Sequence, residues 1–173
     1  MAQKTTQDLR STAFRITVDD LGLFQEVEES VLELGTRGIP IYASWLCNFL
    51  APSADYLKKT QLIGNGLHFN VLEGRAMVKK SLLSNEQGFF FRPWWYFIGA
   101  DRKLRTHLET ELESQILVAK SWFGNLSHLD SHLHLHSIPW IYELFEKMAK
   151  RFQIPYIRNA VEPYEDSKRI FWK

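Results

Sequence analysis

The histidine-rich run at residues 128–136 has the residue types and spacing that most directly suggest chemistry. It reads His-Leu-Asp-Ser-His-Leu-His-Leu-His, so imidazole or carboxylate occupies every second position. Alternate residues of an extended strand share one face, and the run therefore predicts a strand with a polar, ligand-rich face. Neutral imidazole and carboxylate are ligands of borderline divalent metals such as zinc. The run predicts part of a metal site, but alternation alone does not say which histidine is the ligand.

Two other groups of polar residues follow apolar stretches in the same way. Asp19 and Asp20 come directly after the apolar stretch at 14–18, and His68 lies near the end of another at 62–72. Each feature alone has an ordinary interpretation, because an Asp-Asp pair before a turn is usually a cap or a solvated loop. A single histidine is likewise more often a core or surface residue. In combination with the histidine run, they supply the ligand types of a divalent metal site.

The elements that must position these residues alternate between short apolar strands and amphipathic helices. Strands are expected at 14–18, 39–48, 62–72, 128–136 and 154–158, and helices at 26–34, 53–59, 104–116 and 139–152. Regular alternation of strand and helix predicts an α/β fold with a parallel sheet, in which active sites gather at the carboxyl ends of the strands. Asp19, Asp20, His68, the histidine run and Arg158 would then meet at one rim.

Composition places the chain among ordinary globular proteins. Its 173 residues fit one domain spanning 1–173, with residues 1–12 expected to be disordered, and 45% of residues are hydrophobic. A net charge of +1 with scattered basic residues predicts no nucleic-acid partner and no anionic membrane partner. The lone Cys47 excludes an internal disulfide and suits a reducing compartment. With neither a signal-like leader nor a membrane span, we expect a cytoplasmic protein.

Four segments, in order, resemble the YdjC-like carbohydrate deacetylases, a family that includes chitooligosaccharide deacetylases and a hopanoid-biosynthesis branch. The similar segments are residues 16–23 (Ile-Thr-Val-Asp-Asp-Leu-Gly-Leu), 66–70 (Gly-Leu-His-Phe-Asn), 72–75 (Leu-Glu-Gly-Arg) and 128–136. The resemblance extends from residue 14 to residue 158. It implies a parallel (β/α) barrel, one divalent ion (Mg²⁺ or Zn²⁺) and an acetylated amino sugar or oligosaccharide as substrate.

Carried over position by position, the resemblance implies that Asp20, His68 and His132 bind the metal and that Asp19 is the catalytic base. Two histidines and one carboxylate leave coordination positions for water and for the carbonyl oxygen of the substrate. A nearby Arg158 would favour the ionised form of Asp19. Roles in substrate binding or in orienting the ligands are predicted for Arg158, His134, His136, Glu73, Arg75 and Trp94. His128 and Asp130 fit either such a role or that of buried, hydrogen-bonded barrel residues.

The segment at residues 89–97, Phe-Phe-Phe-Arg-Pro-Trp-Trp-Tyr-Phe, is the most unusual in composition. It falls between the third predicted strand and the long helix, where a loop of a βα unit should overhang the site. Aromatic faces stack on sugar rings, which suggests a carbohydrate platform or lid. The competing interpretation is a loop that packs on its own aromatics or against a second subunit.

The chain is short for the family that it resembles. An eightfold barrel takes roughly 250 residues, and the His-Pro-Gly motif that the family carries near its C-terminus is absent from this sequence. We therefore expect an incomplete barrel of about five βα units, in a truncated product, in a naturally shortened relative, or in a chain that closes its barrel by pairing with another copy. The deacetylase interpretation then competes with a metal- or sugar-binding remnant that has lost catalysis. A metal phosphoesterase is more distant, since no arginine cluster for phosphate is evident.

Overall fold

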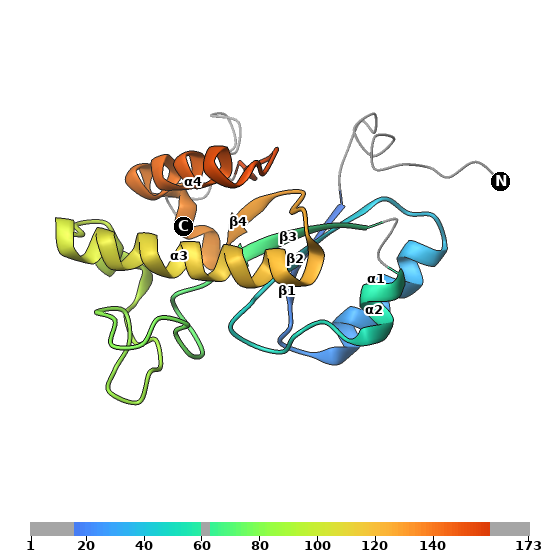
Figure 1. The fold of residues 1–173 in the computed structure, drawn as a ribbon, viewed down its shortest axis with the longest axis horizontal. Helices are drawn as coiled ribbons and strands as arrows, with labels where there is room; N and C mark the ends of the chain where they lie inside the picture. The colour runs from blue at the N-terminus through green and yellow to red at the C-terminus, as the bar shows by residue number, and fades with distance from the viewer. Residues whose placement is uncertain (1–15, 60–62, 160–173) are drawn as a thin grey trace, which may run out of the picture.

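The computed structural model describes residues 16–59 and 63–159. Its centre is one sheet of four parallel strands in the order β1-β2-β3-β4. The strands are β1 (Ile16–Leu21), β2 (Ile41–Trp45), β3 (Ile63–Phe69) and β4 (Leu129–Ser131). The sheet curls into part of a barrel with helices along its outside (Figure 1). The predicted α/β class and incomplete barrel are confirmed, whereas the start of the first predicted strand and the expected disorder at 1–12 lie outside the described residues.

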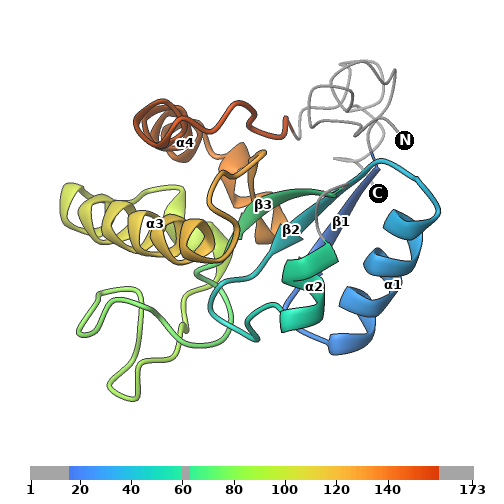
Figure 2. The ribbon, with the colours of Figure 1, turned by 45° about the vertical axis from the view of Figure 1, so that its right-hand side comes forward.

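Four α-helices connect and flank the strands. They are α1 (Gln25–Thr36), α2 (Ala54–Lys59), α3 (Arg102–Phe123) and α4 (Pro139–Phe152). Figure 2 shows α1 and α2 on the β1–β2 side, with α3 and α4 toward β4. Local signals set the helix starts: the Ser53 hydroxyl accepts the Tyr56 N–H at 3.1 Å, and the Asp101 carboxylate accepts the Leu104 N–H at 2.8 Å. All four predicted helices are confirmed among the described residues, and α3 is longer than expected.

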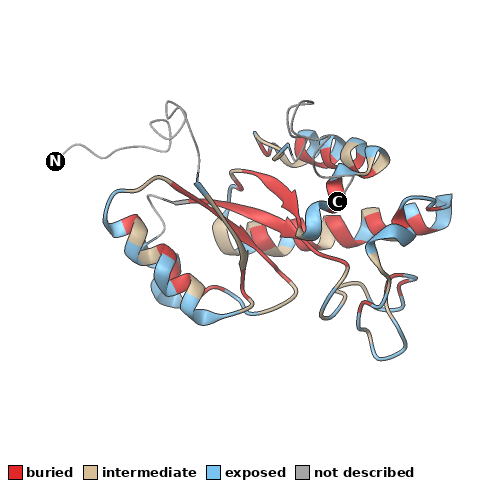
Figure 3. Cartoon of the chain, turned by 180° about the vertical axis from the view of Figure 1, so that it is seen from behind, coloured by how far each residue is buried: buried red, intermediate tan, exposed pale blue. Residues whose placement is uncertain are grey.

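Two apolar clusters hold the helices against the sheet. The larger lies between β3, β4, α3 and α4, and α3 contributes a stripe at every fourth residue: Leu104, Leu108, Leu112 and Ile116. The smaller joins β1 and β2 to α1 and α2 through Trp45 and Tyr56, whose rings meet edge to face with centroids 5.0 Å apart. Buried residues follow the strands and the inner faces of the helices (Figure 3). No helix among the described residues is long and apolar enough to cross a membrane.

The prediction of a strand across residues 128–136 is wrong beyond Ser131. β4 ends there, and the chain turns into a short 3-10 segment, η4 (His132–Ser137). Leu133 and His134 have φ of 50° and 52°, a left-handed conformation that an extended strand cannot accommodate. The turn brings the His136 N–H to the Ser131 hydroxyl at 2.9 Å. The alternation of polar residues therefore does not produce one polar face.

The fifth predicted strand is reduced to a single bridge. Leu129 pairs with Ile157 in parallel, and the Leu129 N–H donates to the Tyr156 carbonyl at 2.9 Å. The Arg158 N–H returns a bond to the Leu129 carbonyl at 3.0 Å. This short pairing is enough to bring Arg158 beside the carboxyl end of β4.

Candidate metal centre

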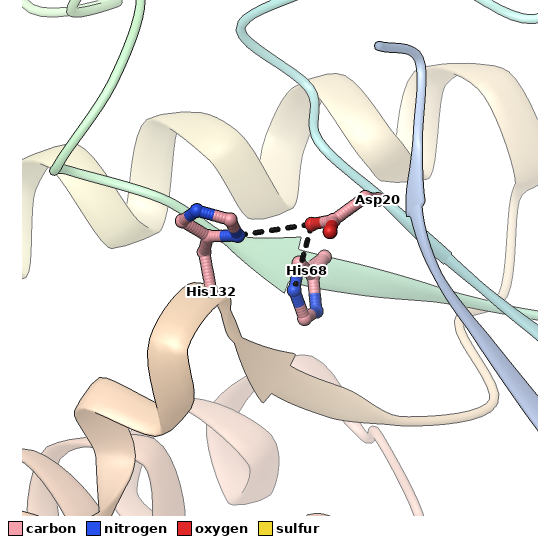
Figure 4. Close-up of side chains that lie close together, drawn as sticks. All are labelled: Asp20, His68 and His132. Carbon is pink, nitrogen blue, oxygen red and sulfur yellow. Dashed lines mark hydrogen bonds and ion pairs between the residues drawn. The ribbon is translucent and has the colours of Figure 1, made fainter. Parts of the chain in front are cut away.

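Asp20, His68 and His132 converge at the carboxyl ends of three parallel strands (Figure 4). One Asp20 carboxylate oxygen, Oδ1, lies 2.9 Å from His132 Nδ1 and 3.3 Å from His68 Nε2. Each residue offers one ligand atom, and the three atoms lie within 4.8 Å of one another. Asp20 comes from β1, His68 from β3 and His132 from the residue after β4. Parallel strands thus bring together residues separated by 112 positions in the sequence.

An irregularity at the end of β1 directs the two neighbouring aspartates into the same site. The pairing of β1 with β2 shifts register between Val18 and Leu21. Within that interval Asp20 has φ of 63°, which is uncommon for a residue with a side chain. Asp20 therefore faces the histidines while Asp19 faces Arg158. Left-handed backbone at a residue other than glycine costs about 1–3 kcal/mol.

Arg158 binds Asp19 from the opposite side of the rim. Its Nη1 donates to both carboxylate oxygens of Asp19, at 2.8 and 2.7 Å, and to Asp130 Oδ2 at 3.3 Å. Burial alone would lower the pKa of the guanidinium, but the hydrogen bond and charge of Asp19 raise it. Asp19 is fixed in orientation, and its side chain is still 33% exposed. The carboxylate is thus held without being sealed from solvent.

His68 is held by carboxylates on both sides. Its Nδ1 lies 2.7 Å from Oδ1 of the buried Asp130, and its Nε2 faces Asp20. Burial alone would lower the pKa of His68, but hydrogen bonds to Asp130 and Asp20 outweigh it and raise the pKa to about 9. The hydrogen bond from His68 in turn holds the pKa of Asp20 below its usual value. Without an ion, a proton on His68 offsets the carboxylate charge.

The geometry of Asp20, His68 and His132 fits a divalent ion. Ligand atoms about 2.1 Å from a tetrahedral metal lie roughly 3.4 Å apart, close to the 2.9 and 3.3 Å separations from Asp20 Oδ1. The Asp20 side chain is 41% exposed, so solvent reaches the same point. Two imidazoles and one carboxylate with an open side are donor types that catalytic metal sites use.

Asp19, His68 and Asp130 form a second group with ligand atoms within 4.8 Å. This group fits a metal less well, because Arg158 Nη1 already lies within 3.3 Å of both carboxylates. A guanidinium between two carboxylates supplies the positive charge that an ion would bring. We therefore assign the candidate metal centre to Asp20, His68 and His132.

The remaining predicted site residues lie at different distances from the centre. Glu73 Oε1 is 3.9 Å from His132 Nε2 on a half-exposed side chain. His134 is exposed, whereas His136 is buried, with its ring stacked on Phe145 at a centroid distance of 5.5 Å. Of this second set, Glu73 approaches His132, and Arg158 pairs with Asp19 and Asp130.

Arg75 and Trp94 belong to the long connection between β3 and α3, drawn in light green in Figure 1. The Arg75 guanidinium stacks on Phe89 at 4.5 Å, and Trp94 begins the short helix η3 (Trp94–Phe97). Phe90 and Phe97 anchor this connection in the core. The exposed members of the aromatic segment are Phe89, Phe91, Trp94, Trp95 and Tyr96.

Two polar residues that support the site were missed by sequence reasoning. Ser44, in the middle of buried β2, donates to Asp130 Oδ1 at 2.6 Å. Asn70 organises the loop that carries Glu73, accepting the Leu72 and Glu73 N–H groups at 2.9 and 3.2 Å. A serine within an apolar stretch carries no signal of such a role. The Asn70 turn was within reach, because asparagine commonly bonds to backbone N–H groups two residues on.

Comparison with known proteins gives a clear assignment. The family model described as "YdjC-like protein" matches residues 14–171. The chain belongs to the YdjC-like family. Among this protein's relatives is the carbohydrate deacetylase of Geobacillus stearothermophilus, 30% identical over 142 residues that make up 81% of this chain and 57% of the relative.

Further relatives of this YdjC-like protein include the human carbohydrate deacetylase and a Yersinia enterocolitica chitooligosaccharide deacetylase. The human protein is 28% identical over 85% of this chain and 48% of its own length. The Yersinia protein is 27% identical over 81% of this chain and 56% of its own length. This YdjC-like chain spans about half the length of the curated relatives it matches.

A solved structure of similar fold is a putative cellobiose-phosphate cleavage protein from Enterococcus faecalis. It superposes with a TM-score of 0.70 at 18% identity, over 89% of this chain and 61% of the other. At this low sequence identity, the similarity supports a shared fold alone.

Proposed function

We propose that this YdjC-like chain binds one divalent ion and hydrolyses the acetamide of N-acetylated amino sugars or oligosaccharides. The observation that carries the proposal is the convergence of Asp20, His68 and His132 at one rim, with Asp19 beside them. The names of the relatives, carbohydrate deacetylase and chitooligosaccharide deacetylase, support this substrate class.

Each residue has a definite task in this proposal. Asp20, His68 and His132 would hold the ion, which supplies Lewis acidity that lowers the pKa of water and polarises an amide carbonyl. Asp19, fixed by Arg158, accepts the proton of the water that attacks the acetamide carbon. When the carbon–nitrogen bond breaks, the proton taken up by Asp19 would pass to the departing nitrogen, giving acetate and a free amine on the sugar. The solvent-facing side of Asp20 is where substrate would enter.

The donor types favour zinc over magnesium as the ion. Two of the three ligand atoms are imidazole nitrogens, which zinc accepts readily, whereas magnesium prefers carboxylate and water oxygen. Zinc loading is therefore the first condition for an activity assay.

The test is acetate release from N-acetylglucosamine oligomers by zinc-loaded protein. Asp19→Asn should lower the rate by roughly 10²–10⁴-fold, the usual contribution of a general base, without loss of bound zinc. Asp55→Asn is a matched control, because Asp55 is an exposed residue of α2 that pairs with Lys59. A wild-type protein that binds no divalent ion, or an Asp19→Asn variant that retains full activity, contradicts the proposal.

A second candidate is binding of metal or sugar without turnover. It is favoured by the match to only 48–57% of the length of the three relatives described above, since groups elsewhere in a relative can contribute to catalysis. Stoichiometric zinc and measurable oligosaccharide binding without acetate release would support this candidate over the hydrolase.

A further inference from the structure

A buried chain of polar side chains lies behind His68. Ser127 Oγ is 2.8 Å from His128 Nδ1, His128 Nε2 is 2.9 Å from Ser44 Oγ, and Ser44 Oγ is 2.6 Å from Asp130 Oδ1. The same Asp130 oxygen is 2.7 Å from His68 Nδ1. His128, Ser44 and Asp130 are almost completely buried. Each proton in this chain must therefore be shared among the protein's own atoms.

Counting protons gives the chain one direction. Ser44 has one hydroxyl proton, and the short contact to the charged Asp130 carboxylate takes it. Ser44 Oγ must then accept from His128, which places a proton on His128 Nε2. Burial disfavours the imidazolium and lowers the pKa of His128, so Nδ1 is an acceptor for the Ser127 hydroxyl. Ser127 Oγ also lies 2.9 Å from the Asn65 carbonyl oxygen, so two acceptors compete for its one hydroxyl proton. The Asn65 carbonyl already accepts from the Ser127 N–H at 2.7 Å, whereas the bare Nδ1 of a neutral His128 has the Ser127 hydroxyl as its donor, which assigns the proton to His128.

The sheet makes room for the His128 ring. A Cβ on Gly66 would lie 2.4 Å from His128 Nδ1 and Cε1, so a side chain larger than glycine at this position collides with the ring. The Tyr42 ring packs edge to face against the His128 ring, with centroids 5.6 Å apart. His128 therefore sits in a fitted slot and has little freedom to flip.

We propose that Ser127, His128 and Ser44 are positioning residues that hold Asp130 as an acceptor for His68 Nδ1–H, so that His68 presents Nε2 to the ion. The inference rests on the proposed function in that Asp20, His68 and His132 bind the metal. Orienting partners of this kind fix the tautomer of a ligating histidine, and their loss typically weakens metal binding 10–100-fold. Because Asp130 is fully buried, water cannot readily replace a lost donor.

The first test needs no metal and examines the chain by itself. Long-range ¹H–¹⁵N correlation spectra of the metal-free protein should show His128 as the neutral tautomer with its proton on Nε2. A proton on Nδ1 instead would overturn the inference, whatever the protein does with zinc.

The second test measures zinc affinity by competition with a chelating dye. Ser44→Ala should weaken zinc binding about 10-fold and Asp130→Asn by 10–100-fold. Gly66→Ala, which displaces the His128 ring while leaving every donor in place, should weaken it comparably. Ser81→Ala is the matched control, because Ser81 is also buried but bonds to the Leu83 N–H.

Spectra of the zinc-loaded protein separate the remaining outcomes. His68 should carry its proton on Nδ1 in the wild type and lose that single tautomer in Ser44→Ala, with folding checked by thermal melting. Wild-type zinc affinity and an unchanged His68 spectrum in both Ser44→Ala and Gly66→Ala would overturn the inference. A wild type that fails to bind zinc would contradict the proposed function, while the His128 tautomer would still decide the direction of the chain.

Discussion

Arg158 Nη1 donates to both carboxylate oxygens of Asp19, across 139 positions of sequence. The contact exists because residue 158 follows the single bridge between Ile157 and Leu129 at the edge of β4. This single bridge between two residues therefore determines the orientation of Asp19, the proposed base.

We expect Arg158→Met to lower the turnover number for acetate release by roughly 10²-fold, a usual cost of misplacing a catalytic group. Arg158→Lys should lower it less than Arg158→Met does, because lysine keeps the positive charge beside Asp19. Steady-state kinetics on zinc-loaded protein measure both effects. Arg151→Met is the control, since Arg151 pairs with Glu113 on a more exposed surface. Equal effects at the two arginines would contradict the positioning role of Arg158.

The metal ligands can be tested without an activity assay. His132→Ala removes a direct ligand in this assignment, and we expect zinc affinity to fall by more than the 10–100-fold typical of outer residues. Isothermal titration or dye competition measures the loss. His107→Ala serves as the control, because His107 contacts Ser81 on the side of α3. An unchanged affinity in His132→Ala would remove His132 from the ligand set.

His136 predicts a particular acid dependence of stability. Burial lowers its pKa from 6.5 to about 4, so the folded protein binds fewer protons at this residue than the unfolded chain does. Its contribution to stability is therefore full above pH 6.5 and is lost as the pH falls toward 4. The shift corresponds to about 3 kcal/mol.

Urea denaturation at several pH values tests this dependence. Between pH 7 and pH 4 the wild type should lose about 3 kcal/mol more unfolding free energy than His136→Leu. Parallel curves for wild type and His136→Leu would contradict the prediction.

The exposed tryptophans test the platform interpretation of the aromatic segment. Trp94 and Trp95 are 49% and 61% exposed, and their rings meet edge to face with centroids 6.2 Å apart, so both rings reach solvent. If they form a platform, replacing either with alanine should raise KM about 3- to 10-fold for long oligosaccharides, the range expected for one aromatic contact. KM for a monosaccharide should stay the same. An unchanged KM for oligosaccharides of every length would favour the interpretation in which the segment packs on itself. The Arg92 guanidinium already stacks on the rings of Phe91 and Tyr96 within this segment.

Much of the fold was predictable because its elements follow simple periodicity. The apolar stripe at every fourth residue identified α3, and Pro139 marked the start of α4. The convergence of Asp20 and His68 followed from the rule that parallel strands end at one rim.

The local backbone of the site was not predictable from periodicity. The histidine run alternates like a strand, but Leu133 and His134 are left-handed, because the chain turns back to bond with Ser131. Asp20 is also left-handed, within the register shift between Val18 and Leu21. Ser44 joins the site through tertiary packing alone, which no pattern in one strand encodes.

The two glycines of β3 that precede His68 have a mechanical consequence for the sheet. At Gly64 an added Cβ would lie 2.8 Å from the Tyr42 ring, and at Gly66 it would lie 2.4 Å from the His128 ring. The layer beneath the metal centre is therefore filled by the rings of Tyr42 from β2 and of His128, which directly precedes β4. Because β3 has no side chains at these two positions, the packing beneath the metal centre depends on how rigidly β2 and β4 hold these two rings.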